Sequence, residues 1–164
     1  MNYDDWGSWS SAVGPNAPLN DSCAPSGDQQ GSAVSAVKAW SNAGMPISQI
    51  VLGVPSYGHS YYVNSTDAFV PGTKMLAQYP AFNRSNLPGG DAWNIGNGTL
   101  EFFSLVSSGF LTPEGTAAPG IFYRFDPCSQ TVRRPSTKCS TMFFLRTLSL
   151  ALRLQSDIRS HDFL

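Results

Sequence analysis

The chain has 164 residues, of which 41% are hydrophobic and 13% are charged. This length and composition suit a globular protein with a real core and exclude a disordered chain. The formal net charge of -1 gives no reason to expect nucleic acid or an anionic membrane as a partner.

The first part of the chain predicts a strand, a long loop, a helix and a second strand. Residues 1–4 have the character of the end of a strand, and residues 5–28 form a loop rich in Ser, Pro, Asn, Gly and Asp. Loops of this length are often functional. Residues 31–43 predict a helix, and the continuous apolar run at 49–55 predicts a strand buried on both faces. This order is typical of a βαβ unit with parallel strands.

The predicted helix at 31–43 carries its own start and stop signals. Ser32 is a candidate N-cap, and Gly44 followed by Pro46 ends the helix. Three side chains fall on one face and are expected in the core: Val34, Val37 and Trp40. The helix is therefore expected to pack along this face.

The second part of the chain changes character twice. Residues 63–126 alternate short apolar pieces with Gly and Pro turns, which predicts a small α+β unit with a short helix at 101–108. Residues 131–140 are basic and rich in Ser and Thr, and residues 142–158 have helix-forming composition. The most apolar stretch, 142–154, contains two arginines and is too short to span a bilayer.

Cysteines and glycosylation sequons indicate the compartment. The three cysteines form no Cys-x-x-Cys pair, so neither a metal nor a cofactor is expected. A disulfide between Cys23 and Cys128 is possible, but no spacing argument selects it. Four Asn-x-Ser/Thr sequons begin at Asn20, Asn64, Asn83 and Asn97. They favour an extracellular parent protein, with an ordinary Ser-rich surface as an equal alternative; we recognise no signal peptide at Met1.

Two motifs lie at the ends of the two predicted strands. The first is Met1-Asn2-Tyr3-Asp4 followed by Gly7-x-Trp9, and the second is Gly53-Val54-Pro55-Ser56-Tyr57-Gly58. In this order they resemble the sixth and seventh barrel strands of glycoside hydrolase family 18, the retaining chitinases, and specifically the secreted fungal type. The resemblance covers roughly residues 1–130. It implies an α/β fold, an incomplete (β/α)8 TIM-barrel fragment with a small α+β insertion, and hence a piece of a longer enzyme.

The resemblance implies two catalytic residues on the first motif. The family cleaves β-1,4-linked N-acetylglucosamine polymers by a mechanism in which the substrate's own acetamido oxygen attacks the anomeric carbon. Tyr3 matches the tyrosine that holds this acetamido group, and Asp4 matches the carboxylate that accepts hydrogen bonds from the sugar. Met1 matches the apolar residue under that sugar. The simpler alternative for Asp4 is a turn-capping role.

The same resemblance implies three further substrate-binding residues. Trp9 matches an aromatic ring that stacks on a sugar, and Tyr57 matches a tyrosine that lines the cleft. His59 stands where many members have Arg, which puts a charge-assisted sugar contact in doubt. The alternatives are a loop aromatic for Trp9 and a surface or hydrogen-bonded histidine for His59.

The general acid of the family is absent from this chain. It is the Glu of an Asp-x-x-Asp-x-Asp-x-Glu run, whereas the chain has only Glu101 and Glu114, neither in such a run. We therefore expect a chitinase fragment that is inactive alone. The alternatives are a non-catalytic protein that binds chitin or N-acetylglucosamine oligosaccharides, and a non-functional truncated product.

A shift in charge suggests the domain boundaries. Residues 1–120 hold three basic and eight acidic side chains, and residues 121–164 hold seven basic and three acidic ones. We expect a barrel fragment at 1–62, an insertion at 63–130 and an atypical basic tail at 131–164, whose origin we attribute to a frameshift or a retained intron. Open strand edges in such a fragment also predict self-association.

Overall fold

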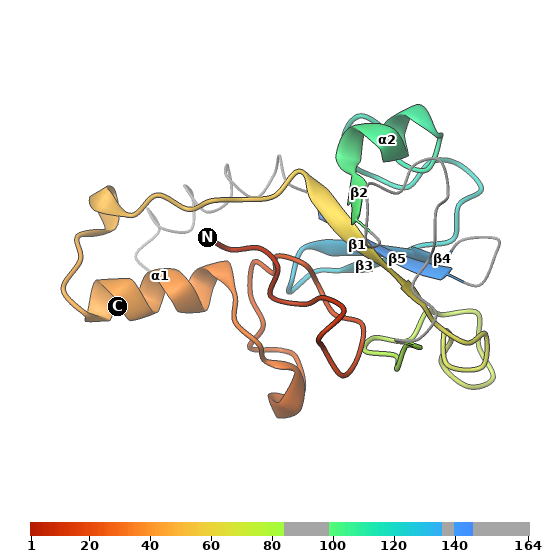
Figure 1. Ribbon diagram of the computed structural model, residues 1–164, viewed down its shortest axis with the longest axis horizontal. Coiled ribbons are helices and arrows are strands. Elements are labelled where there is room, and N and C mark those ends of the chain that lie inside the picture. The colour runs from red at the N-terminus through yellow and green to blue at the C-terminus, as the bar shows by residue number, and fades with distance from the viewer. Residues whose placement is uncertain (84–98, 136–139, 146–164) are drawn as a thin grey trace.

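The computed structural model describes residues 1–83, 99–135 and 140–145. A five-stranded sheet lies at one end of the molecule and the longer helix lies at the other, joined by extended chain (Figure 1). The elements follow in chain order: η1 Ser26–Asp28, α1 Ala33–Asn42, η2 Ile47–Gln49, β1 Tyr57–Tyr62, β2 Thr99–Glu101, α2 Phe102–Ser107, β3 Arg124–Asp126, β4 Thr131–Pro135 and β5 Ser140–Leu145.

The sheet is antiparallel, with strand order β2-β1-β5-β4-β3. β1 is flanked by β2 through Tyr57↔Glu101 and by β5 through Ser60↔Met142. This differs from the predicted βαβ unit, and the described residues form no closed barrel. The physical reason is that β1 pairs with β2 and β5, which come from the second half of the chain, and does not pair with residues 1–4.

The predicted helix is confirmed as α1. Its N-cap is Ser32, whose hydroxyl accepts a hydrogen bond from the Ser35 N–H, while the Ser35 hydroxyl accepts one from the Ser32 N–H. The helix ends before Gly44, whose φ of +93° favours glycine. The predicted face is only partly buried: Val37 lies in the core, but Trp40 is 58% exposed, so its expected place in the core is wrong.

The strand predicted at 49–55 is not present. Only its first residue, Gln49, belongs to η2, residues 50–55 are in no regular element, and the strand β1 starts at Tyr57. A buried parallel strand needs partners on both edges. The Asn2 N–H donates a hydrogen bond to the Gly53 carbonyl oxygen at 3.0 Å. Residues 1–4, predicted as the end of a strand, are likewise irregular and lie beside Gly53.

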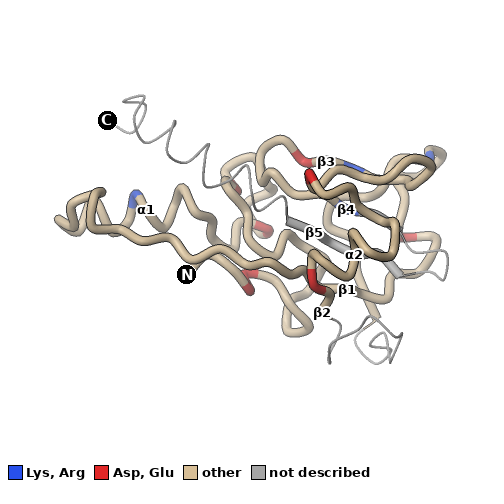
Figure 2. The backbone as a smooth tube through the Cα atoms, turned by 90° about the horizontal axis from the view of Figure 1, so that it is seen from above, with Lys and Arg blue, Asp and Glu red and all other residues tan. Residues whose placement is uncertain are grey.

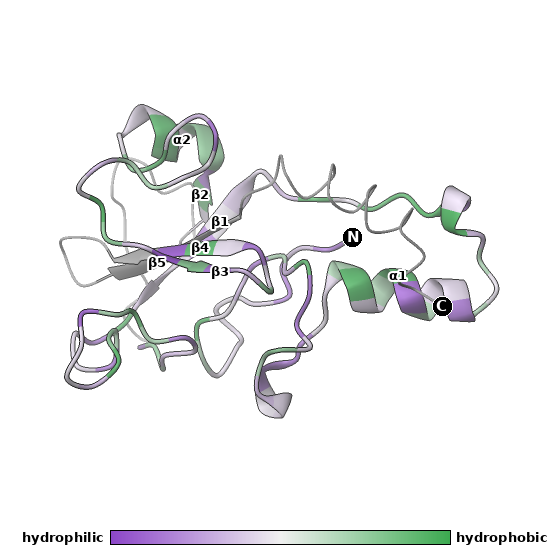
Figure 3. Ribbon diagram, turned by 180° about the vertical axis from the view of Figure 1, so that it is seen from behind, coloured by the Kyte–Doolittle hydropathy of each residue, from purple (hydrophilic) through white to green (hydrophobic). Residues whose placement is uncertain are grey.

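Apolar side chains gather in three small clusters. One lies at β1, one at α2 and one at the start of α1, where apolar segments also show in Figure 3. Their buried members are Val13, Tyr61, Val63 and Ala68; Leu100, Leu105 and Leu111; and Leu19 and Ala33. The short helix α2 agrees with the helix predicted at 101–108, and it ends before Gly109. Apolar burial in the described residues is therefore divided among these small clusters.

An aromatic and cationic stack ties the N-terminal loop to β4. The Trp6 ring is buried and stacks on Tyr79, with centroids 5.6 Å apart. The guanidinium of Arg133 lies 5.0 Å from the centroid of the Tyr79 ring. Arg133 is fully buried, and this burial lowers its pKa to about 10. The first residues of the predicted tail therefore contribute to the packing.

The helix predicted at 142–158 is contradicted where it can be compared. Residues 142–145 belong to β5, because they pair with β1 and β4. The rest of that prediction lies outside the described residues.

Charged side chains are sparse along the described backbone (Figure 2). Within 1–83, 99–135 and 140–145, no helix has the length and apolar character needed to cross a membrane.

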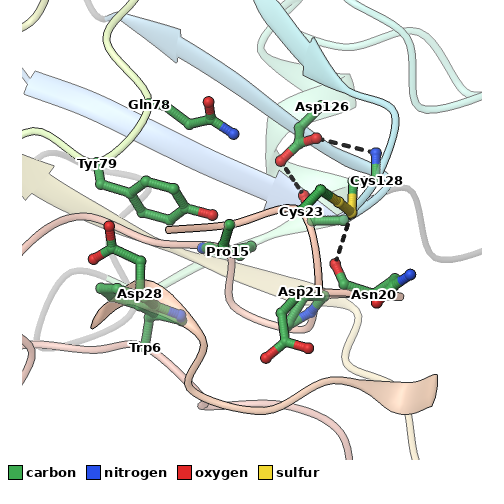
Figure 4. Close-up of a pocket in the computed structure, with 13 residues that line it drawn as sticks. Trp6, Pro15, Asn20, Asp21, Cys23, Asp28, Gln78, Tyr79, Asp126 and Cys128 are labelled. Carbon is green, nitrogen blue, oxygen red and sulfur yellow. Dashed lines mark hydrogen bonds between the residues drawn. A yellow bond between two sulfur atoms is a disulfide. The ribbon is translucent and has the colours of Figure 1, made fainter. Parts of the chain in front are cut away.

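A disulfide joins Cys23 to Cys128, with Cα atoms 6.5 Å apart. The pairing left open by the sequence is thereby decided. The bond anchors the long N-terminal loop to the turn after β3, beside Asp126, whose carboxylate accepts hydrogen bonds from the Cys128 N–H and the Ser129 hydroxyl (Figure 4). The loop of residues 5–28 is therefore held at a point far from it in sequence.

Candidate functional site

The centre of the candidate site is the carboxylate of Asp4. The Tyr57 hydroxyl donates to it and lies 2.9 Å from both carboxylate oxygens. The Nε2 atom of His59 lies 3.0 Å from the Asp4 Oδ1 atom. Tyr57 and His59 are two residues apart on β1, so their side chains point to the same face of the sheet. One strand therefore supplies both partners of Asp4. Asp4 itself has a φ of 61°, a conformation that Asp tolerates better than most residues.

Asn16 positions Asp4 and β1, a role that the sequence did not indicate. Its Oδ1 atom accepts a hydrogen bond from the Asp4 N–H at 3.1 Å, and its Nδ2 atom donates to the Tyr57 carbonyl oxygen at 3.2 Å. Its carbonyl oxygen also accepts from the Asp5 N–H. Asn16 is buried within an otherwise apolar stretch. A lone amide in such a stretch is the signal that could have identified it, because buried amides need partners.

Tyr3 lies beside this cluster. Its ring meets the Tyr57 ring edge to face, with centroids 6.3 Å apart and an interplanar angle of 71°. Gly53 lies beside this ring, since a Cβ there would be 3.4 Å from the Tyr3 ring, an ordinary van der Waals contact. The Tyr3 hydroxyl is directed at the Met1 sulfur, while Met1 as a whole is 90% exposed. Tyr3, Asp4, Tyr57 and His59 are thus brought together.

Trp9 does not join them. Its side chain is 62% exposed, and it folds back over Gly7, where a Cβ would overlap its ring. In the part of the chain that the structure describes, no ring contact links Trp9 to Tyr3 or Tyr57. Any sugar contact of Trp9 therefore stays a prediction that depends on this loop.

Burial, and then the charges of the site, raise the pKa of Tyr57 and of Asp5. Burial, and then the hydrogen bond from Tyr57 to Asp4, raise the pKa of Tyr57 to about 12. Burial, followed by the negative charges of Asp21 and Asp4, raises the pKa of Asp5 to about 6. The Oδ2 atom of Asp5 is buried and has no hydrogen-bond partner among the described residues. Asp5 was not singled out by the sequence.

Strand pairing places the acidic residue Glu101 directly opposite Tyr57 in the sheet. It is the Cα partner of Tyr57 in the antiparallel pair of β1 and β2, and His59 is the partner of Thr99. Directly opposed residues share one face of a sheet. Glu101 is exposed and lies on the face that carries Tyr57 and His59. The sequence placed Glu101 at the start of the helix expected at 101–108 and assigned it no role in the site.

A small hollow lies beside the disulfide, apart from the cluster around Asp4 (Figure 4). It is bordered by Trp6, Tyr79, Cys23 and Cys128, and its volume of about 10 Å³ suits a water molecule rather than a sugar. Three carboxylates also border it: Asp21, Asp28 and Asp126. Even so, no group of three or more His, Cys, Asp or Glu side chains in the described ranges is arranged to hold a metal ion. The sugar-site candidates therefore remain those around Asp4.

Comparison with known families identifies the chain. The sequence model of the family described as "Glycosyl hydrolases family 18" matches residues 1–129. This chain belongs to glycosyl hydrolase family 18. The match ends before β4, so the family 18 part contains every residue of the candidate site.

Curated relatives of this family 18 chain include two fungal proteins. A chitinase-like effector of Moniliophthora roreri is 51% identical over 144 residues, which cover 80% of this chain and 35% of that protein. A chitinase-like effector of Moniliophthora perniciosa is 49% identical over 141 residues, covering 79% of this chain and 32% of that protein. The chain thus spans about a third of the length of these relatives.

Solved structures show the same fold over most of the chain. A chitinase of Rhizomucor miehei superposes with a TM-score of 0.73 at 24% identity, covering 96% of this chain and 44% of that one. A family 18 chitinase of Cycas revoluta, in complex with (GlcNAc)4, superposes with a TM-score of 0.63 at 20% identity, covering 95% of this chain and 37% of that one. The family 18 chain therefore corresponds to less than half of these chitinase chains.

Proposed function

We propose that this family 18 chain binds N-acetylglucosamine oligosaccharides of chitin through Tyr3, Asp4, Tyr57 and His59, and that it does not hydrolyse them unaided. The observation that carries the proposal is the joint contact of Tyr57 and His59 with the Asp4 carboxylate. Aromatic rings and a carboxylate in one partly exposed cluster suit a sugar, because rings cover its C–H faces and the carboxylate accepts hydrogen bonds from its hydroxyls.

The chemistry of an acetamido sugar fits the two N-terminal side chains. A phenol hydroxyl such as that of Tyr3 can donate to the acetamido oxygen without competing as a nucleophile. Asp4 accepts hydrogen bonds from the same sugar. In the free chain the Asp4 carboxylate is engaged by Tyr57 and His59, so binding exchanges or shares these bonds.

Hydrolysis needs a proton donor for the leaving oxygen. General acid catalysis contributes typically 10²–10⁴-fold. The chain has only two glutamates, Glu101 and Glu114, and neither stands in the acidic run of the family. We therefore assign binding to this chain and chitinase activity, by substrate-assisted retaining hydrolysis, to a longer protein that supplies the acid.

Two findings support an extracellular, chitinase-like role. Two curated relatives, 51% and 49% identical to the chain, carry the name chitinase-like effector. The disulfide between Cys23 and Cys128 needs an oxidising compartment. We propose that the chain acts outside the cell, where chitin fragments are present.

The test is a titration of the 164-residue chain with (GlcNAc)4 by isothermal calorimetry, with product analysis of the same samples. We expect binding without cleavage. Tyr3→Phe and Asp4→Asn should weaken binding at least tenfold, because each removes a hydrogen-bonding group that the sugar uses. Tyr123→Phe, at an exposed tyrosine outside the cluster, is the matched control and should bind as the unaltered chain does.

Two results would contradict the proposal. Absence of binding by a folded chain would reject the sugar-binding role and favour a non-functional fragment. Release of shorter oligosaccharides by the unaltered chain would reject the assignment of binding without hydrolysis.

A further inference from the structure

The sequons of the chain differ in how accessible they are. Two of the four, those at Asn20 and Asn64, lie entirely within the described residues. Those at Asn83 and Asn97 extend outside them. Attachment of an N-linked glycan needs a surface asparagine followed by Ser or Thr one residue further on. The choice among described sites is therefore between Asn20 and Asn64.

Asn64 lies on an open turn just after β1. Its carbonyl oxygen accepts hydrogen bonds from the N–H groups of Asp67 and Ala68, which shapes the turn. Residues 64–67 are all exposed. The amide nitrogen of the Asn64 side chain makes only a long contact, 3.4 Å, with the Asp67 carboxylate. Thus the group that would be modified, and the Thr66 hydroxyl that completes the sequon, both face solvent.

Asn20 is placed much less openly. Its side-chain oxygen accepts a hydrogen bond from the Ser22 N–H at 3.0 Å, and its carbonyl oxygen faces the Cys128 sulfur at 3.6 Å. It borders the hollow beside the disulfide (Figure 4). A glycan there would have to emerge next to the Cys23–Cys128 bond. The geometry therefore disfavours Asn20.

We infer that Asn64 carries an N-linked glycan. This rests on the extracellular part of the proposed function, because the donor, a lipid-linked oligosaccharide diphosphate, belongs to the secretory compartment in which the disulfide also forms. The new bond joins the Asn64 amide nitrogen to the anomeric carbon of the donor sugar. The bond between that carbon and the diphosphate breaks, the amide proton leaves with the diphosphate, and nothing is oxidised or reduced.

The glycan leaves the candidate sugar site open. β1 runs from Tyr57 to Tyr62, and Asn64 follows its far end. At about 3.3 Å per residue along a strand, Asn64 lies roughly 20 Å from Tyr57. The residues that flank the turn, Val63 and Ala68, pack with Val13 in one buried cluster, whereas residues 64–67 are exposed to solvent. A glycosylated chain should therefore still bind chitin oligosaccharides.

The test is secretion of the full chain, behind a cleavable signal peptide, from a eukaryotic host, followed by mass spectrometry of its glycopeptides. We expect the peptide that contains Asn64 to carry a glycan that peptide N-glycosidase removes. Asn64→Gln and Thr66→Ala should each abolish this glycan and lower the apparent mass by one glycan. Asn20→Gln is the matched control and should leave the glycan at Asn64 in place.

An unmodified Asn64 in secreted chain with the Cys23–Cys128 bond formed would overturn the inference. An unchanged apparent mass on Asn64→Gln would do the same. Titration of the same material with (GlcNAc)4 tests the proposed function independently of the glycan at Asn64. A glycan at Asn64 without sugar binding supports the modification and rejects only the function, whereas sugar binding with an unmodified Asn64 rejects only the modification.

Discussion

Asp4 and Tyr57 are joined by a hydrogen bond although 53 residues separate them. The bond ties the N-terminal segment to the first residue of β1 and places a carboxylate between a phenol and the imidazole of His59. Because the two segments share few other main-chain contacts, this polar cluster and Asn16 hold the candidate site together. A substitution of one residue of this cluster should therefore change a measurable property of another.

The ionisation of Tyr57 should report on Asp4. The negative carboxylate and its hydrogen bond disfavour the phenolate, so Asp4→Asn should lower the pKa of Tyr57 below its value of about 12. Burial is the larger cause, so the pKa should stay above the ordinary value of 10. A pH titration of the tyrosine ring carbons by NMR measures this. Asp67→Asn, at an exposed turn, is the control, and an unchanged Tyr57 titration in Asp4→Asn would refute the coupling.

Asp5 should make the chain less stable as the pH rises. Its pKa is about 6 in the folded chain against 3.8 for the ordinary group, so the folded state holds the proton more tightly. The stabilisation is complete below pH 3.8 and is lost as the pH rises through 6. After allowance for solvent screening we expect a loss of about 1 kcal/mol.

Asp5→Asn isolates this effect. The amide cannot ionise, so the decline in stability between pH 4 and pH 6 should flatten, and the variant should be the more stable chain at pH 7. Urea unfolding at each pH measures the free energy of unfolding. An equally steep decline in the variant would show that other groups cause it.

Gly14 should be intolerant of a methyl group. A Cβ at Gly14 would overlap the buried ring of Trp6, which has Tyr79 stacked on it. Overpacking of this kind costs about 1–3 kcal/mol, so Gly14→Ala should lower the free energy of unfolding by that amount. Gly27→Ala is the matched control, because no atom lies within 4 Å of a Cβ there. Equal stabilities for the two variants would contradict the packing described.

The disulfide should stabilise the chain substantially. It closes a loop of 105 residues, and such bonds contribute typically about 2–4 kcal/mol by restricting the unfolded chain. Cys23→Ser and Cys128→Ser should therefore destabilise the chain by similar amounts, measured by thermal unfolding. Cys139→Ser, which removes the remaining thiol, should have a smaller effect. A stable Cys23→Ser chain would show that the N-terminal loop is held by other contacts.

Two helices, α1 and α2, were predicted well because their signals are local, whereas the helix predicted at 142–158 was wrong at 142–145, which form part of β5. Ser32 and Gly44 mark the ends of α1 within one stretch of sequence, and α2 likewise ends before a glycine. Strands were predicted poorly. The apolar run at 49–55 has strand-like composition, yet Val51 is 92% exposed and the strand begins at Tyr57. Whether a segment becomes a strand depends on the partner that reaches it.

The amino-acid sequence alone determined the family to be expected, the two motifs, the missing acidic run and the ends of α1. These properties reside in neighbouring residues and need no folded partner. The tertiary structure alone decided that Asp4 meets Tyr57 and His59, that Asn16 positions them, that Trp9 lies apart and that Cys23 pairs with Cys128. Each of these is a contact between segments distant in the chain, and such contacts follow from how the whole chain packs.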